Sequence, residues 1–164
     1  MTDRLREPIV VVLGHVDHGK CVAGETPIAT EEGEIPAWKL FERYREVGKP
    51  IQVGDGVAVR LQRGPRLLTV TSDGRPIFRR ISHIWRRDAK PKMVEVETST
   101  GVKISSTPEH PYLSLRGRVF TSVNASNLME GDIVLTYMDG GLGTDVVEAK
   151  AFTEPADRYV YDSV

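Results

Sequence analysis

Residues 14–27 read Gly-His-Val-Asp-His-Gly-Lys-Cys-Val-Ala-Gly-Glu-Thr-Pro, and this stretch decides how the chain folds. Its first part follows the G-x-x-x-x-G-K pattern of a phosphate-binding loop, which continues with a Mg²⁺-holding Ser or Thr and then a helix. Here Cys21 replaces the hydroxyl residue, while Gly24 and Pro27 oppose a helix. The sequence therefore predicts a nucleotide-binding loop interrupted after its last residue, the loop being Gly14, His15, Val16, Asp17, His18, Gly19 and Lys20.

Composition places the chain among ordinary globular proteins. It has 164 residues, of which 40% are hydrophobic and 27% charged, with a formal net charge of −1. This balance gives no overall attraction to nucleic acid or membranes, and no apolar run is long enough to span a bilayer. The N-terminus does not resemble a signal peptide, and a single cysteine suits a reducing compartment. We expect a cytoplasmic monomer without membrane or nucleic-acid partners.

The first twenty residues differ in character from the remainder. Residues 8–13 form a continuous apolar run, which is typical of a strand buried on both faces of a parallel sheet. A GTPase domain would continue with alternating helices and strands and with N-K-x-D and D-x-x-G motifs, none of which follows. The sequence predicts two units, with residues 1–20 as the start of one fold and residues 21–164 as another.

Residues after Cys21 are expected to be mostly β. Gly-containing turns separate the short strands, and Asp73-Gly74 favours a hairpin. A helix is predicted at 36–47, where Ala37, Leu40, Phe41 and Tyr44 share a face. A second short helix is expected at 125–129, and residues 138–155 are expected to form a loop or weak hairpin. Strands are predicted at 26–30, 57–61, 66–71, 77–85, 92–97, 102–106, 112–115, 118–121 and 133–137.

The sequence Thr107-Pro108-Glu109-His110 carries the clearest chemistry in the second unit. A hydroxyl and an imidazole three residues apart at a strand end can enter one pocket. Histidine serves as a general acid near neutral pH, and a threonine hydroxyl can stabilise a developing oxyanion. Alone, this spacing is more often a structural turn. Together with a cysteine inside an interrupted motif, it indicates a reactive site.

A basic segment permits another interpretation. Arginines and lysines surround His83 and Trp85, which could form a nucleic-acid patch. The alternation of Ile81, His83 and Trp85 favours a simpler reading, one face of a long solvated strand with charges near its ends. Trp38 is expected in the core beside Phe41. The sequence contains no C-x-x-C or H-E-x-x-H pattern, so no metal site is predicted.

Residues 21–164 resemble an intein, the self-splicing insert of the Hint fold. The segment from Cys21 to Ile28 resembles the first intein block, which opens with the nucleophilic cysteine. Residues 102–111 resemble the block containing T-x-x-H, residues 127–135 resemble the end of the N-terminal splicing region, and residues 159–162 resemble the start of a late block with an acid. The resemblance implies an all-β, horseshoe-like splicing domain.

This resemblance also implies a role for particular residues. Cys21 would attack the carbonyl of Lys20 in an N-to-S acyl shift, with His110 protonating the departing nitrogen. Thr107 would help hold the carbonyl oxygen, and Asp162 would assist proton transfer at the thiol. The family's closing His-Asn block and its endonuclease signature do not appear, so the chain resembles a mini-intein that needs a C-terminal segment with its downstream flank as partner. Splicing itself would need no cofactor.

Residues 1–20 resemble the opening of an archaeal translation initiation factor of the GTPase class related to bacterial initiation factor two. They would be the N-terminal flank, or extein, and a Thr after the insert would restore the phosphate-binding loop. GTP and Mg²⁺ would then bind only the spliced host. The rival interpretation is that the chain itself is a GTP-binding translation factor fragment.

Overall fold

The computed structural model describes residues 9–10, 21–71, 73–88, 92–138, 141–154 and 159–163. Strands dominate these ranges and form a 12-stranded and a 4-stranded sheet, which confirms the predicted all-β class. The strands are β1 (Ile9–Val10), β2 (Val22–Ala23), β3 (Pro27–Thr30), β4 (Gly33–Pro36), β5 (Lys49–Val53), β6 (Gly56–Arg60), β7 (Arg66–Val70), β8 (Pro76–Arg80), β9 (His83–Arg87), β10 (Met93–Thr98), β11 (Lys103–Ser106), β12 (Pro111–Arg116), β13 (Val119–Asn124), β14 (Ile133–Met138), β15 (Gly141–Thr153) and β16 (Val160–Ser163).

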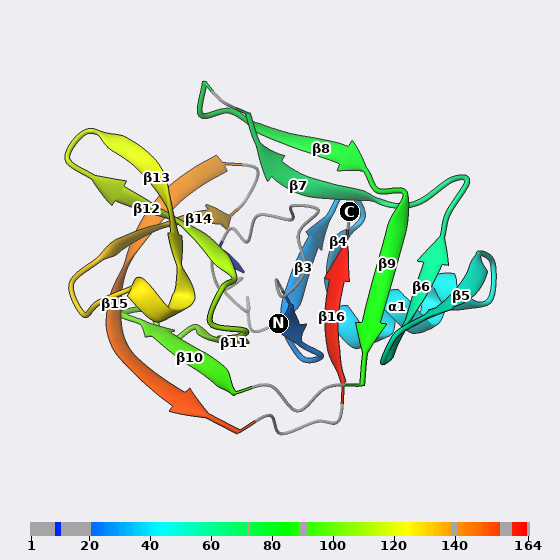
Figure 1. The fold of residues 1–164 in the computed structure, drawn as a ribbon. Helices are drawn as coiled ribbons and strands as arrows, with labels where there is room; N and C mark the ends of the chain where they lie inside the picture. Colours follow the sequence, from blue (N-terminus) through cyan, green and yellow to red (C-terminus); the bar gives the residue numbers. More distant parts are fainter. Residues whose placement is uncertain are drawn as a thin grey trace, which may run out of the picture.

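The larger sheet joins two groups of strands through the short strand β2. Its order is β13-β12-β14-β15-β10-β11-β2-β16-β9-β6-β5, with β1 added beside β14. Figure 1 shows β10 to β15 gathered on one side and β9, β6 and β5 on the other, with the red strand β16 between them. The smaller sheet has the order β4-β3-β7-β8. Because β2 pairs with both β11 and β16, the residue just before it lies where the two groups meet.

Each group of strands has its own hydrophobic core. One core surrounds Phe41 and Val59, and the other surrounds Tyr112 and Leu128, all four of which are fully buried. A third, smaller cluster contains Cys21, Met93 and Val160. Burial of apolar surface stabilises each core at about 25 cal/mol per Å². The only cysteine of the chain therefore lies in a small apolar cluster of its own at the junction.

Helix α1 (Ala37–Arg45) confirms the helix predicted from the apolar face. Ala37 and Phe41 are buried on that face, but Trp38 is 40% exposed, so its predicted place in the core is wrong. The helix is tied to the segment after Cys21 because Trp38 N–H donates to the Gly24 carbonyl at 3.0 Å. That segment forms β2 and a turn, as Gly24 and Pro27 predicted, rather than a helix.

Residues 138–155 correct the sequence interpretation most clearly. They hold β15, whose 13 residues form a long strand where a loop or weak hairpin was expected. Its first half pairs with β14 and its second half with β10, with an irregularity opposite Glu97 and Thr98. The glycines at its start do not break the strand, because partners on the neighbouring strands satisfy its backbone. The expected helix at 125–129 is a single 3-10 turn, η1 (Ala125–Asn127).

Two further expectations about strands are wrong. The predicted strand 77–85 is two strands, β8 and β9, which belong to different sheets and are separated by Ile81 and Ser82. Residues 8–13 were expected in a parallel sheet. Within them, Ile9 and Val10 pair antiparallel with Tyr137 and Thr136 of β14. Among the described residues, no helix combines the length and apolar character that crossing a bilayer requires.

Candidate functional site

The site is centred on the backbone of Cys21, whose N–H and carbonyl groups are both hydrogen-bonded to Thr107. Cys21 N–H donates to the Thr107 Oγ1 at 3.0 Å, and Thr107 N–H donates to the Cys21 carbonyl at 2.8 Å. The same hydroxyl donates to the Cys21 carbonyl at 3.3 Å. The Cys21 nitrogen is one end of the Lys20–Cys21 peptide bond. Thr107 therefore contacts the nitrogen end of the bond that the sequence interpretation singles out.

The turn that carries Thr107 and His110 is held from several directions. His110 N–H donates to the Thr107 carbonyl at 3.0 Å, which closes the turn. η1 fixes the turn from outside, because Ala125 N–H donates to the His110 carbonyl at 2.8 Å and Ser126 N–H to the Pro108 carbonyl at 3.0 Å. Thr107 and His110 are both almost fully buried. The polar groups of this turn are thus positioned before any reaction begins.

The His110 ring is oriented by its neighbour Tyr112. The two rings meet edge to face, with centroids 5.7 Å apart. The Tyr112 hydroxyl lies 3.1 Å from Ser106 Oγ, and burial raises the pKa of Tyr112 to about 12. Tyr112 therefore stays protonated around neutral pH and acts as a fixed wall. Histidine remains the side chain of this turn suited to moving a proton.

Asp162 reaches Cys21 through strand register. Val160 pairs with Ala23, and Tyr161 with Val22. One further step of this antiparallel register sets Asp162 beside Cys21. The negative charge of Asp162 raises the pKa of Cys21. A carboxylate next to a thiol can accept its proton.

The Cys21 thiol is strongly held in its neutral form. Burial, followed by the charge of Asp162, raises its pKa from 9.0 to about 12, while the charge of Arg87 and a hydrogen bond from its side chain act in the opposite direction. With such a pKa, roughly one thiol in 10⁵ is ionised at pH 7. Attack by sulfur therefore requires that its proton be removed as the new bond forms.

The structure brings together some of the predicted residues and leaves others outside its described part. Thr107 hydrogen-bonds to Cys21, His110 lies in the same turn as Thr107, and strand register sets Asp162 beside Cys21. Lys20 and the loop residues from Gly14 to Gly19 lie outside the described residues. The sequence does not single out Arg87, because it is one of the basic residues around His83 and Trp85 that were predicted to be charges near the ends of a solvated strand. Only the pairing of β9 with β16 could have revealed it.

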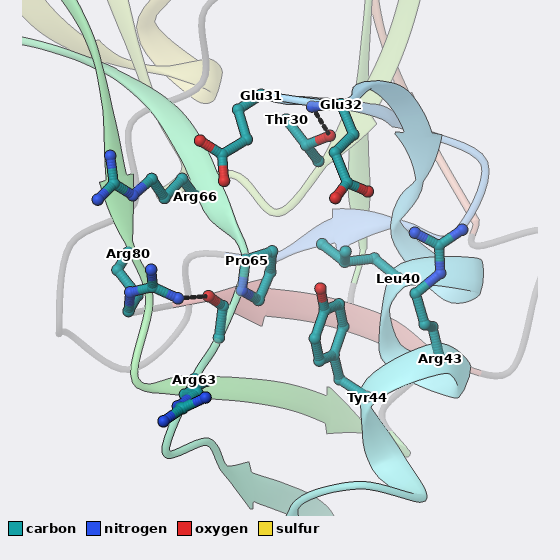
Figure 2. A pocket seen from close by; sticks show the side chains of 11 residues that line it. Thr30, Glu31, Glu32, Leu40, Arg43, Tyr44, Arg63, Pro65, Arg66 and Arg80 are labelled. Carbon is teal, nitrogen blue, oxygen red and sulfur yellow. Dashed lines mark hydrogen bonds between the residues drawn. The ribbon is translucent and has the colours of Figure 1, made fainter.

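A pocket elsewhere on the molecule is separate from this junction. Figure 2 shows its polar lining, contributed by the β3–β4 turn, α1 and the segment around β7. Its volume is about 160 Å³. Arg80 is committed to the Gly64 carbonyl at 2.8 Å, and charges of both signs line the walls. The four residues of the junction do not contribute to it.

The basic segment does not form one continuous stripe within the described residues. Arg79 and Arg80 lie in β8, whereas Arg86 and Arg87 lie in β9 of the other sheet. Arg86 stacks over the Phe41 and Tyr159 rings, at 4.9 and 4.2 Å from their centroids. Three of these arginines therefore interact with the protein itself, namely Arg80, Arg86 and Arg87. The described residues also contain no group of three or more His, Cys, Asp or Glu that could hold a metal ion.

No protein-family model matches the chain. Among curated proteins, the chain is 38% identical over 135 residues to "Probable translation initiation factor IF-2" of Thermococcus kodakarensis, which covers 82% of this chain and 11% of that protein. It is 30% identical over 153 residues to one of the subunits of the A-type ATP synthase of Thermoplasma volcanium, covering 87% of this chain and 20% of that protein. The chain thus spans a small part of each relative, and the two relatives have different functions.

Among solved structures, the chain is similar to the crystal structure of the "TvoVMA intein". The TM-score is 0.79 with 26% sequence identity, and the match covers 90% of this chain and 88% of that one. Two proteins with different functions thus share a segment similar to this chain, and a solved intein matches the chain over almost its whole length. This pattern is expected of a domain that is inserted into unrelated host proteins.

Proposed function

The chain belongs to the inteins, autocatalytic protein splicing elements, and we propose that its Cys21 begins splicing by attacking the carbonyl of Lys20. The observation that carries this proposal is the 3.0 Å hydrogen bond from Cys21 N–H to Thr107 Oγ1. It locates a buried polar group on the nitrogen that must leave. The attacking sulfur belongs to the same residue, so proximity requires no further binding step.

The proposed step is an isomerisation that balances within the chain. Cys21 Sγ transfers its proton to Asp162 and forms a bond to the Lys20 carbonyl carbon. The carbon–nitrogen bond then breaks, and the nitrogen takes a proton from His110 to become an amine. Asp162 is left with one proton more and His110 with one proton less. Transfer of that proton from Asp162 to His110 through solvent restores both groups, so that the net change is one proton moved from sulfur to nitrogen and the product is a thioester. No oxidant, reductant, metal or cofactor enters this balance.

Thr107 acts on the nitrogen side in this proposal. Its Oγ1 accepts a hydrogen bond from the scissile N–H and donates one to the Cys21 carbonyl. Twisting the nitrogen out of amide resonance weakens the peptide bond, and a fixed acceptor favours that geometry. The sequence resemblance assigned Thr107 to the carbonyl oxygen of Lys20. That assignment stays a prediction, since Lys20 lies outside the described residues.

For the host, we propose that residues 1–20 open an archaeal translation initiation factor. The similarity to the Thermococcus protein supports this. Ligation would require a C-terminal intein segment and its downstream flank, and GTP with Mg²⁺ would bind only after the loop is restored. A cytosolic location suits a thiol that must remain reduced.

The test is mass spectrometry of the intact chain after addition of a small thiol. We expect release of residues 1–20 as a thioester of the added thiol, and no release from Cys21→Ala. Equal release from Cys21→Ala would contradict the proposal. A GTP titration of the same chain tests the rival function. We expect no binding, and tight binding would favour a nucleotide-binding fragment.

A further inference from the structure

Four neighbouring strands align a row of residues that crosses from Cys21 to the β5–β6 turn. Ala23 pairs with Val160, Val160 with Arg87, and Arg87 with Gly56. Paired residues lie on one face of a sheet, and alternate residues of a strand return to that face. Arg87 therefore shares a face with Ala23 and hence with Cys21, which packs against Val160. Asp162, two residues after Val160, lies on the same face.

Two features hold the Arg87 side chain on this face. Asp55 Oδ1 accepts from Arg87 Nε at 3.4 Å and from Nη2 at 3.5 Å. Gly56 leaves room for the stem of the arginine, because a Cβ there would lie 3.3 Å from Arg87 Cγ and 2.5 Å from the Arg86 carbonyl oxygen. Any larger residue at this position would push β9 away. Asp55 thus binds the guanidinium of Arg87, and Gly56 leaves space for the side chain.

The electrostatics at the thiol agree with this placement. Burial raises the pKa of Cys21 most, and the charges of Asp162 and Asp55 raise it further. Arg87 lowers it through its charge and through a hydrogen bond. Within the described ranges, Arg87 is the cation whose charge acts on this sulfur. Its guanidinium is therefore placed to offset the negative charge that develops there.

We propose that Arg87 is a further catalytic residue of the acyl shift, whose guanidinium, anchored by Asp55, stabilises the sulfur of Cys21 as it loses its proton to Asp162. This inference rests on the proposed function of Cys21. It assigns a role to a strand-end arginine far from the cysteine in sequence. A hydrogen bond to a charged sulfur is about twice as strong as one between neutral groups, so the benefit appears mainly as the thiolate forms.

The test compares thiol-dependent release from Arg87→Ala with that from Arg86→Ala. Arg86 is the matched control, because it lies on the opposite face over Phe41 and Tyr159. We expect Arg87→Ala to release residues 1–20 about 10- to 100-fold more slowly than the unaltered chain, and Arg86→Ala within about threefold of it. Added guanidinium ion should restore several-fold of the lost rate in Arg87→Ala, whereas an equal concentration of sodium ion should not.

Other outcomes separate the two hypotheses. An unaltered chain that releases nothing refutes the proposed function of Cys21. If the unaltered chain reacts and Arg87→Ala is equally fast, or guanidinium is no better than sodium, only the role of Arg87 fails. Arg87→Lys provides a second variant if Arg87→Ala does not fold. It retains the charge and the stem, so we expect a rate below that of the unaltered chain, and an unchanged rate would overturn the need for a guanidinium fork.

Discussion

Strand β11 connects two polar turns, and the ionisable side chain beside one turn is charged whereas the side chain beside the other is neutral. The turn before β11 contacts Asp145 of β15, whose buried carboxylate accepts hydrogen bonds from the Ser99 and Thr100 hydroxyls and from Val146 N–H at 2.8 Å. Although burial would raise the pKa of Asp145, these hydrogen bonds hold it at about 2. The turn after β11 contacts Cys21 through Thr107, and burial together with the charge of Asp162 raises the pKa of Cys21 to about 12.

Burial alone therefore does not decide whether an ionisable group is charged or neutral. Asp145 is 5% exposed and Cys21 is 2% exposed, yet one is stabilised as an ion and the other as a neutral thiol. Asp145 has hydroxyl and backbone donors around it, whereas Cys21 lies with Met93 and Val160 in an apolar cluster beside a carboxylate. The first turn therefore contributes to stability. At the second turn, Cys21 stays a neutral, unreactive thiol until its proton is removed.

Removing the imidazole of His110 from the turn after β11 should have the largest effect on the reaction. We expect His110→Ala to slow thiol-dependent release by about 10²- to 10⁴-fold, because the leaving nitrogen loses its proton donor. The rate is measured by mass spectrometry of the released fragment. His83→Ala, a histidine in β9, is the control and should react at nearly the original rate. Unimpaired release from His110→Ala would remove that residue from the reaction.

A smaller effect is expected from the hydroxyl of Thr107. Thr107→Val leaves Cys21 N–H without its acceptor, and we expect release to slow by about 10²-fold. Thr107→Ser keeps the hydroxyl and should remain within about tenfold of the unaltered chain. If the valine and serine variants react alike, the bond to the scissile nitrogen has no catalytic consequence.

The first turn should respond in stability rather than in reaction rate. We expect Asp145→Asn to lower the free energy of unfolding by about 1–2 kcal/mol at pH 7 and to leave release unchanged. Because the folded-state pKa of Asp145 is depressed, its contribution is present above about pH 4 and is lost as the pH falls through about 2. Urea unfolding of both chains at several pH values measures this. A stability difference that persists at the lowest pH would contradict the assignment.

Ionisation of Cys21 at alkaline pH should lower the free energy of unfolding by a still smaller amount. A thiol whose folded-state pKa is raised contributes stability below its unfolded value, and this contribution is lost as the pH rises toward 12. Between about pH 9 and 10 the unaltered chain should therefore lose about 1 kcal/mol more stability than Cys21→Ala does. Comparing the slopes cancels the tyrosines and lysines common to both chains. Parallel slopes would mean that the thiol is not desolvated.

Much of this arrangement could be predicted from local sequence, and the rest depends on pairing between distant strands. The Lys20–Cys21 interruption and the T-x-x-H turn are visible because each is a short pattern with its own chemistry. The strand β15 was missed because its glycines suggest a loop when read alone, while β14 and β10 provide its hydrogen-bond partners. Propensity gives way to such tertiary context.

Arg87 and Trp38 illustrate the same limit at the level of side chains. The role of Arg87 follows from register across β2, β16, β9 and β6, which no single segment encodes. Trp38 looks like a core residue by type, but it lies beside the buried face of α1 and remains partly exposed. Consecutive side chains of an α-helix point about 100° apart around the helix axis, so the neighbour of a buried residue can face solvent. For both Arg87 and Trp38, the position on the strand or helix determines the surroundings of the side chain more than the residue type does.

Transfer of the Lys20 carbonyl onto the Cys21 sulfur can be detected with hydroxylamine in the absence of added thiol. Hydroxylamine cleaves thioesters and leaves peptide bonds intact. We expect residues 1–20 to appear as a hydroxamate of Lys20, with none from Cys21→Ala. A chain that stays whole under these conditions, or one cut at any other bond, would show that the acyl group does not move from Lys20 to Cys21.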